Sequence, residues 1–157
     1  MSRSSLEAAV PPYAEILLDT SVILAYLNAS EAASPATTVV IDDFVRTGRN
    51  RATISAVSVA ETLVRPFDAG AVALGIVDAF LLHFPNLTVS SIDYAIAREA
   101  ARLRAQTGLK TPDALIIATA LGAGISLVIA NDAKWASAIA DAAPTVTLCH
   151  LDAHVPL

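Results

Sequence analysis

Ile16-Leu17-Leu18-Asp19-Thr20-Ser21 is an apolar run that ends directly in a carboxylate. A second stretch near the other end of the chain, Leu127-Val128-Ile129-Ala130-Asn131-Asp132, repeats this pattern. Short apolar runs of this kind are typical of buried parallel strands. Because ligands bind at the carboxyl ends of the strands in an open α/β sheet, both acids are expected at the ligand-binding edge of such a sheet.

Further strand-like runs alternate with helical stretches along the rest of the chain. This alternation predicts an α/β fold with three layers, in which helices cover both faces of a mostly parallel sheet. The expected strands cover residues 16–18, 52–55, 87–90, 126–130 and 146–149. The clearest helices cover residues 20–27, 35–45, 69–84, 93–106 and 112–121.

The length of 157 residues suits one domain, which we assign to residues 16–157, after a loose N-terminal arm of residues 1–15. Residues 114–131 carry no charge, but Gly122-Ala123-Gly124 interrupts them, so a helix followed by a buried strand fits better than a membrane span. The start of the chain does not resemble a secretion signal, which predicts a cytoplasmic protein without a membrane anchor. The net charge of −5 indicates that any contact with nucleic acid is local.

Two more acids are expected at the same edge of the sheet. Glu61 shares a narrow polar helix face with Ser58, one turn away, and Asp113 lies in the first turn of the 112–121 helix. Each acid alone has an ordinary structural explanation, such as a helix cap or a favourable interaction with the helix dipole. Their shared position favours a joint site over four separate structural roles.

Carboxylates gathered in one cleft raise each other's pKa unless a cation offsets their charge. Since no cysteine or histidine cluster accompanies them, the expected ion is hard, Mg²⁺ or Mn²⁺ rather than zinc. Such an ion can lower the pKa of bound water and hold a phosphodiester for in-line attack. The acids therefore predict metal-dependent hydrolysis of a nucleic-acid backbone.

Taken together, these motifs resemble PIN-domain nucleases, especially the VapC-type toxins of bacterial toxin–antitoxin pairs. The resemblance runs from about Ile16 to Leu148 and is carried by residues 17–21, by Glu61 in a Ser-x-x-Glu setting, by residues 110–118 and by residues 131–135. It implies a five-stranded sheet of order 3-2-1-4-5 and a metal-dependent endoribonuclease, in which metal-activated water leaves a 5′-phosphate and a 3′-hydroxyl.

The resemblance also implies roles for individual residues. The acids that would hold one or two Mg²⁺ ions are Asp19, Glu61, Asp113 and Asp132. Ser21 and Thr111 would be supporting hydroxyls, and Asn131 would orient the site. Ala130 departs from the family pattern, because many relatives have Thr or Ser there, which removes one supporting hydroxyl.

Basic residues offer candidate contacts to RNA. Arg65 and Lys134 lie close in sequence to two of the acids and are candidates for the scissile phosphate, although a surface ion pair is an alternative. Two arginine-containing groups would either hold structured RNA further out or form ordinary solvated surface. They comprise Arg46, Arg49 and Arg51 in one group, and Arg98, Arg102, Arg104 and Lys110 in the other.

Residues 69–84 form an expected helix that is apolar on more than one face, and we expect it to bind an antitoxin segment or a second copy in a homodimer. Two other interpretations remain open. The chain could be a PIN-domain nuclease for RNA maturation or DNA cleavage, or a non-catalytic PIN-like binding module whose acids act only as caps.

Overall fold

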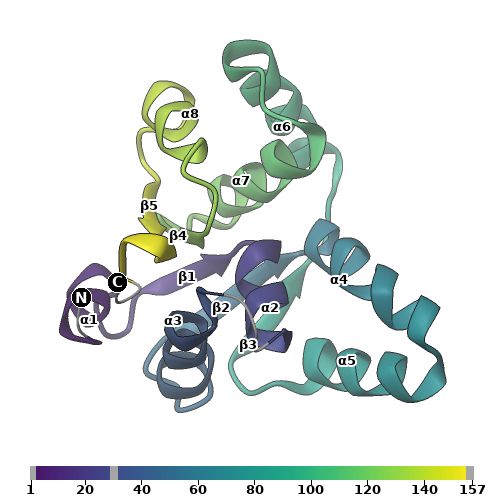
Figure 1. Ribbon diagram of the computed structural model, residues 1–157. Coiled ribbons are helices and arrows are strands. Elements are labelled where there is room, and N and C mark those ends of the chain that lie inside the picture. The colour runs from purple at the N-terminus through teal and green to yellow at the C-terminus, as the bar shows by residue number, and fades with distance from the viewer. Residues whose placement is uncertain (1–2, 29–31, 155–157) are drawn as a thin grey trace.

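The computed structural model describes residues 3–28 and 32–154, and its centre is a single parallel sheet (Figure 1). The strands lie in the order β3-β2-β1-β4-β5, as the resemblance implied. They are β1 (Glu15–Leu18), β2 (Arg51–Ser55), β3 (Leu87–Ser90), β4 (Leu127–Ala130) and β5 (Thr147–His150). All four pairings are parallel, and the predicted strand boundaries are confirmed to within one residue.

Helices flank the sheet on both faces, which confirms the predicted α/β architecture (Figure 1). The α-helices are α1 (Arg3–Ala9), α2 (Thr20–Leu27), α3 (Ser34–Thr38), α4 (Ala56–Ala69), α5 (Ala71–His83), α6 (Tyr94–Thr107), α7 (Thr111–Ala123) and α8 (Trp135–Ala142). A π-helix, η1 (Val39–Val45), follows α3, and a 3₁₀ turn, η2 (Leu151–His154), follows β5.

The central strands separate two hydrophobic cores. Because side chains alternate along a strand, Ile16 and Leu18 of β1 pack into one core, whereas Leu17 packs into the other. The second core contains Ala100 of α6 and Ala114 of α7, whose small side chains let the helices approach closely. This packing explains how a chain with 5% aromatic residues fills its interior.

Three predicted helices begin or continue differently from the sequence-based expectation. The 35–45 helix changes from α-helix to π-helix at Val39. The 69–84 helix begins only at Ala71, because Gly70 has a φ of +102°, a backbone conformation that favours glycine, and this residue separates α4 from α5. α7 begins one residue earlier than expected, so Lys110 rather than Thr111 occupies the N-cap position.

The described part of the N-terminal segment is packed, in contrast to the loose arm that we expected. Leu6 and Val10 are buried in the first core. The side-chain amide of Asn50 donates to the carbonyls of Pro11 and Ala14, both at 2.8 Å. Residues 3–14 therefore share the core of the region that follows them.

The uncharged stretch 114–131 divides into α7, a turn at Gly124 and strand β4, as predicted. Among the described helices, none has both the length and the hydropathy needed to cross a bilayer.

Candidate active site at the carboxyl edge of the sheet

The topology of the sheet brings the predicted acids to one edge. β1 pairs with β4 at the centre of the sheet. The strands β2 and β3 extend the sheet on the side of β1, and β5 extends it on the side of β4, so the direction of strand addition reverses between β1 and β4 and makes this pair the switch point. Asp19 directly follows β1, and Asp132 follows β4 after one intervening residue. Glu61 lies in α4, which starts immediately after β2. Asp113 lies in the first turn of α7, and electrostatic interactions with Asp132, Glu61 and Asp19 place it beside all three.

Asp19 is held by the first turn of α2. Only 6% of its surface is exposed, and its Oδ2 accepts from both the backbone N–H and the hydroxyl of Ser21, at 3.1 and 2.5 Å. The same hydroxyl oxygen accepts from the N–H of Asn131 at 3.0 Å. Ser21 therefore links the acid after β1 to the segment after β4, and its predicted contact with Asp19 is present.

Glu61 is positioned by a residue that the sequence analysis did not single out. The buried Thr20 hydroxyl donates to Glu61 Oε2 at 2.5 Å and lies 3.0 Å from the hydroxyl of Ser58. The predicted polar face of Ser58 and Glu61 thus points toward α2. In the sequence, only the position of Thr20 directly after Asp19 could have indicated this role. Threonine is also common at the start of helices that have no functional site, so the position alone does not identify it.

Burial is the main influence on the ionisation of Asp19 and Asp113 at this edge. Burial raises the pKa of Asp113, and the negative charges of Asp132 and Glu61 raise it further, whereas Lys110 lowers it. Burial also raises the pKa of Asp19 and outweighs the hydrogen bonds from Ser21 and Thr20 that favour the ionised form; Asp113 adds a smaller increase. Perturbed carboxylates in this arrangement are a feature of functional sites.

The donor set fits a hard divalent cation. Every predicted ligand is a carboxylate, and a cation would offset their repulsion. In addition, the buried Oδ1 of Asn131 has no hydrogen-bond partner among the described residues. Within the same part of the chain, no three acidic, histidine or cysteine side chains are close enough together to hold an ion as they stand. Binding by three of the acids therefore requires their side chains to move inward.

The remaining predicted residues differ in how closely they approach the acids. The Asp132 side chain bonds within its own turn, because its Oδ1 accepts from the N–H of Lys134 at 2.9 Å. Asn131 contacts Ser21 through its N–H and lies with its carbonyl 3.2 Å from His150 Nε2. Thr111 is exposed at the start of α7, so its supporting role stays a prediction.

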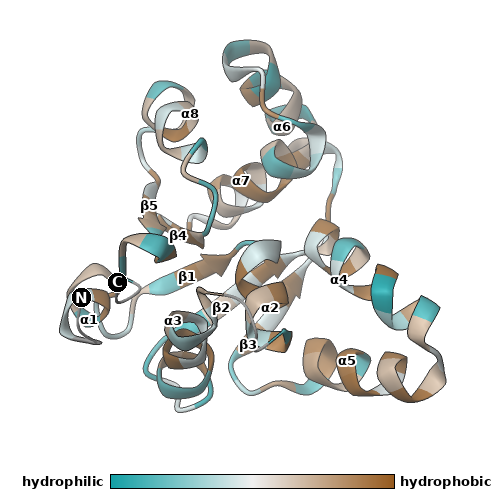
Figure 2. Ribbon diagram, in the orientation of Figure 1, coloured by the Kyte–Doolittle hydropathy of each residue, from teal (hydrophilic) through white to brown (hydrophobic). Residues whose placement is uncertain are grey.

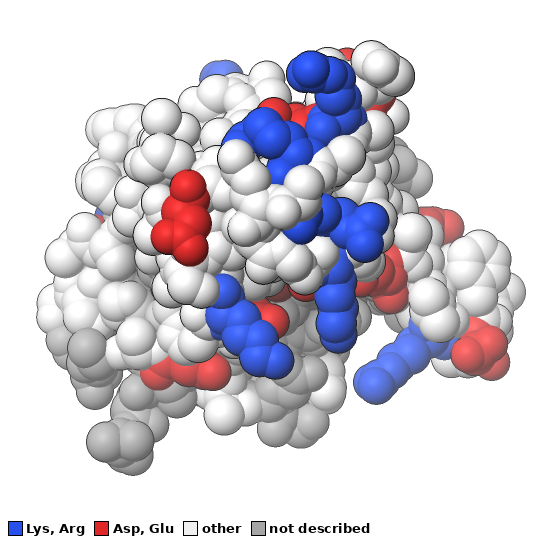
Figure 3. Space-filling model, turned by 90° about the horizontal axis from the view of Figure 1, so that it is seen from above, with Lys and Arg blue, Asp and Glu red and all other residues white. Residues whose placement is uncertain are grey.

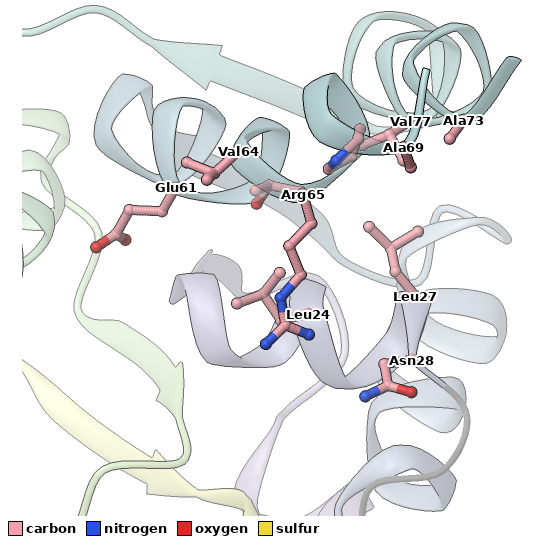
Figure 4. A pocket seen from close by; sticks show the side chains of 11 residues that line it. Leu24, Leu27, Asn28, Glu61, Val64, Arg65, Ala69, Ala73 and Val77 are labelled. Atoms are coloured by element: carbon pink, nitrogen blue, oxygen red, sulfur yellow. The ribbon is translucent and has the colours of Figure 1, made fainter. Parts of the chain in front are cut away.

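The two basic candidates face different hollows. Lys134 lines a polar cavity of about 410 Å³ together with Asp113 and Asp132. Arg65 instead lines an apolar groove, and Figure 4 shows its side chain pointing away from that of Glu61. The position of Lys134 agrees with a phosphate contact better than that of Arg65.

The apolar groove lies between α2 and the α4–α5 pair and has a volume of about 580 Å³ (Figure 4). Its wall includes Leu24, Leu27, Val64 and Val77, and Glu61 stands at its rim. Hydrophobic residues also run along the outside of α5, where Val72 is 80% exposed (Figure 2).

Several arginines in the two predicted basic groups have structural partners. Arg46 forms an ion pair with Asp42 at 2.7 Å and lies over the Phe84 ring. The Arg49 guanidinium lies over the Phe44 ring, 4.0 Å from its centroid.

In the second group, the Arg102 side chain binds Glu99 and the carbonyl of Ala142, which joins α6 to the end of α8. Lysine and arginine side chains nevertheless lie beside acidic ones on the face shown in Figure 3. Arg104 also donates to the carbonyl of Leu109, at 3.2 Å, so four of these arginines have partners within the fold.

An open parallel sheet with carboxylates at its switch point defines the class, an α/β protein with an acidic site suited to divalent ions. The chain belongs to the PIN domain family, whose model matches residues 16–140. The predicted resemblance to this nuclease family is thereby confirmed.

Solved structures with the same fold include toxins and toxin–antitoxin complexes. The Mycobacterium tuberculosis VapC20 toxin, which cleaves the sarcin–ricin loop, matches with a TM-score of 0.65 and 20% identity. The match covers 78% of this chain and 94% of the toxin chain. FitAcB from Neisseria gonorrhoeae matches with a TM-score of 0.66 and 20% identity, over 87% and 97% of the two chains.

VapBC2 from Rickettsia felis, bound to a promoter DNA fragment, matches with a TM-score of 0.63 and 17% identity, over 87% and 98%. At these identities the likeness shows the fold. A search of curated proteins found no match.

Proposed function

We propose that this protein is a Mg²⁺- or Mn²⁺-dependent endoribonuclease that acts as the toxin of a type II toxin–antitoxin pair in the cytoplasm. The observation that carries the proposal is the set of electrostatically coupled carboxylates at the switch point of a PIN-domain sheet. Burial and nearby negative charge make Asp19 and Asp113 costly to keep ionised, which is explained if they serve to hold a cation.

In this proposal Asp19, Glu61, Asp113 and Asp132 hold one or two ions. A bound divalent ion supplies Lewis acidity, which lowers the pKa of water and offsets the charge that develops on the phosphate. The chain's own hydroxyls orient the ligands: Ser21 keeps Asp19 in place, and Thr20 does the same for Glu61. Because water is the nucleophile, the products would carry a 5′-phosphate and a 3′-hydroxyl.

The apolar groove supports the proposed antitoxin partner. Several solved relatives are toxin–antitoxin complexes, among them complexes from Klebsiella pneumoniae and Salmonella typhimurium. The groove is lined mainly by apolar side chains, which suits the hydrophobic face of a helix. Because Glu61 stands at its rim, a helix bound there would lie beside the acids. The exposed outer face of α5 is the proposed surface for a second copy in a homodimer.

The test is cleavage of total bacterial RNA by the purified chain with Mg²⁺ or Mn²⁺, followed by mapping of the cut ends. We expect discrete cuts with 5′-phosphates. Matched samples contain EDTA or the Asp19→Asn variant, which keeps the size and hydrogen bonding of the side chain but removes its charge. Cleavage should disappear in both.

Three results would redirect the proposal. Full cleavage by a folded Asp19→Asn variant would show that the acidic edge is not the active site. Cleavage of DNA, or of a single precursor RNA only, would favour the alternative of a PIN-domain nuclease in DNA cleavage or RNA maturation. Absence of both cleavage and metal binding would favour the non-catalytic module.

A further inference from the structure

The polar cavity beside the acids has features that the four carboxylates do not explain. It is formed by the end of α6, the segment leading into α7 and the start of α8, and it has a volume of about 410 Å³. Small-molecule sites in proteins begin at about 300 Å³, so the cavity is large enough for a nucleotide. Asp113 and Asp132 form part of its wall, which makes it continuous with the candidate active site.

Both lysines of the chain line this cavity. The sequence contains only Lys110 and Lys134, and they approach the cavity from different elements, the N-cap of α7 and the residue before α8. Both are exposed, and no ion pair within 4.0 Å engages either ammonium group among the residues that the structure describes. In contrast, Arg46 and Arg102 are paired with acids. The cavity therefore combines free positive charge with the carboxylates of the reaction centre.

A buried donor without a partner lies in the same wall. Trp135 lines the cavity with only 1% of its surface exposed, and its indole N–H makes no hydrogen bond within the described chain. Buried polar groups almost always have partners, and an unpaired donor costs free energy. Because the N–H is itself enclosed, an oxygen acceptor on a ligand in the cavity would satisfy it once the indole ring or its neighbours shift to bring it to the cavity surface.

We propose that this cavity is a nucleotide subsite, which holds the ribonucleotide next to the scissile phosphate. Lys110 and Lys134 bind the phosphates on either side of that nucleotide, and the Trp135 N–H donates to an oxygen of its base or sugar. This assignment rests on the proposed nuclease function and deepens it, because it names where the substrate chain leaves the acidic edge. It also gives the cavity a direct role in the choice of cleavage position.

The chain carries a reporter for this test, because Trp135 is its only tryptophan. The purified chain is titrated with each of the four ribonucleoside 3′,5′-bisphosphates, which carry a phosphate on either side of the nucleoside, lack an internucleotide bond and are not consumed. Tryptophan fluorescence is recorded in Mg²⁺ and again in EDTA. We expect at least one nucleotide to give a saturable change, whereas inorganic phosphate alone gives none.

Variants identify the groups that bind. Lys110→Ala and Lys134→Ala should each weaken the best nucleotide roughly 3- to 10-fold, because each removes a charge-assisted hydrogen bond to phosphate. Arg46→Ala removes the same charge from a side chain that is paired with Asp42 outside the cavity, and should leave the affinity unchanged. Trp135→Phe, measured by calorimetry, should weaken binding roughly 2- to 10-fold through the lost N–H.

The outcomes separate this inference from the proposed function. RNA cleavage by the native chain without any nucleotide-dependent fluorescence change would overturn the subsite and leave the nuclease in place. Nucleotide binding that depends on the lysines, in a chain that cleaves nothing, would support the subsite and contradict the nuclease. An equal response to phosphate alone, or unchanged affinity in both lysine variants, would also overturn the subsite.

Discussion

Replacement of Ser21 by alanine is the sharpest test of how the acidic edge is built. The Ser21 hydroxyl donates to Asp19 and accepts from the N–H of Asn131, so a single oxygen joins the ends of β1 and β4. Hydrogen bonds to charged groups contribute about 1.5–3 kcal/mol, and an N–H left without a partner costs about 1–3 kcal/mol. Water can replace part of both because Ser21 is half-buried, so we expect a loss of about 2–4 kcal/mol.

The expected loss should be visible in thermal unfolding, where about 2–4 °C of Tm corresponds to each kcal/mol in a chain of this size. We therefore expect Tm to fall by roughly 5–15 °C at neutral pH. The loss should shrink in acid, since the Ser21 bond lowers the pKa of Asp19 and stabilises only its ionised form. Ser126→Ala, at an exposed serine that leads into β4, is the matched control and should change Tm little.

The reasoning would be refuted by a stability loss below about 0.5 kcal/mol, the usual range of a surface substitution. A loss of the expected size that stayed the same between pH 4 and pH 7 would also contradict it. In that case the stability would come from the Asn131 contact alone, and Ser21 would not hold the carboxylate.

Four further predictions follow from contacts and charges described above. Thr20→Val keeps the approximate shape of the side chain but leaves Glu61 without its hydroxyl donor, so RNA cleavage by the folded variant should fall roughly 10- to 100-fold, as measured by initial rates with calorimetry to show that the variant is folded; an unchanged rate would contradict the positioning role. The pKa values of Asp19 and Asp113 are raised in the folded chain, so the folded state binds more protons than the unfolded state. The free energy of unfolding in EDTA should therefore decrease as pH rises from 3.8, the ordinary pKa of aspartate, through the folded pKa values. Mg²⁺ at 100 times its Kd should add about 2.7 kcal/mol at neutral pH, and an equal gain in the Asp113→Asn variant would contradict ligation by that acid. Arg49→Ala removes a bond to the Val10 carbonyl and the contact with Phe44, and should raise amide exchange in α1 more than in α7; uniform exchange would contradict a local anchor.

The strands and the acidic edge could be predicted because local signals agree there. β1 and β4 are short apolar runs that end in polar residues, and the parallel arrangement places such ends together without further information. The family resemblance supplied the strand order, which hydrophobic pattern alone does not determine. The packing of α1 could not be predicted from local signals, because it depends on residues far away in the sequence. The Asn50 amide and the Arg49 guanidinium donate to backbone carbonyls just after α1.

The details of the site were harder to predict for the same reason. Thr20 is indistinguishable in sequence from any threonine at a helix start, and its contact with Glu61 arises only when α2 and α4 pack together. The contact between the Asn131 N–H and the Ser21 hydroxyl likewise joins residues 110 positions apart in the chain, so it arises only when β1 and β4 pair. The cavity lined by Lys110 and Lys134 joins segments that are separate in the chain, so no sequence pattern marks it.

One residue, Glu61, belongs to two surfaces at once. Its carboxylate faces α2 at the acidic edge, while the same side chain forms the rim of the apolar groove one helical turn from Val64 and Arg65. A substitution that reshapes this end of the groove therefore also disturbs a proposed catalytic ligand. If the groove accepts an inhibitory partner, the chain cannot escape that partner at this position without losing activity, so selection on binding and selection on catalysis act on the same residue.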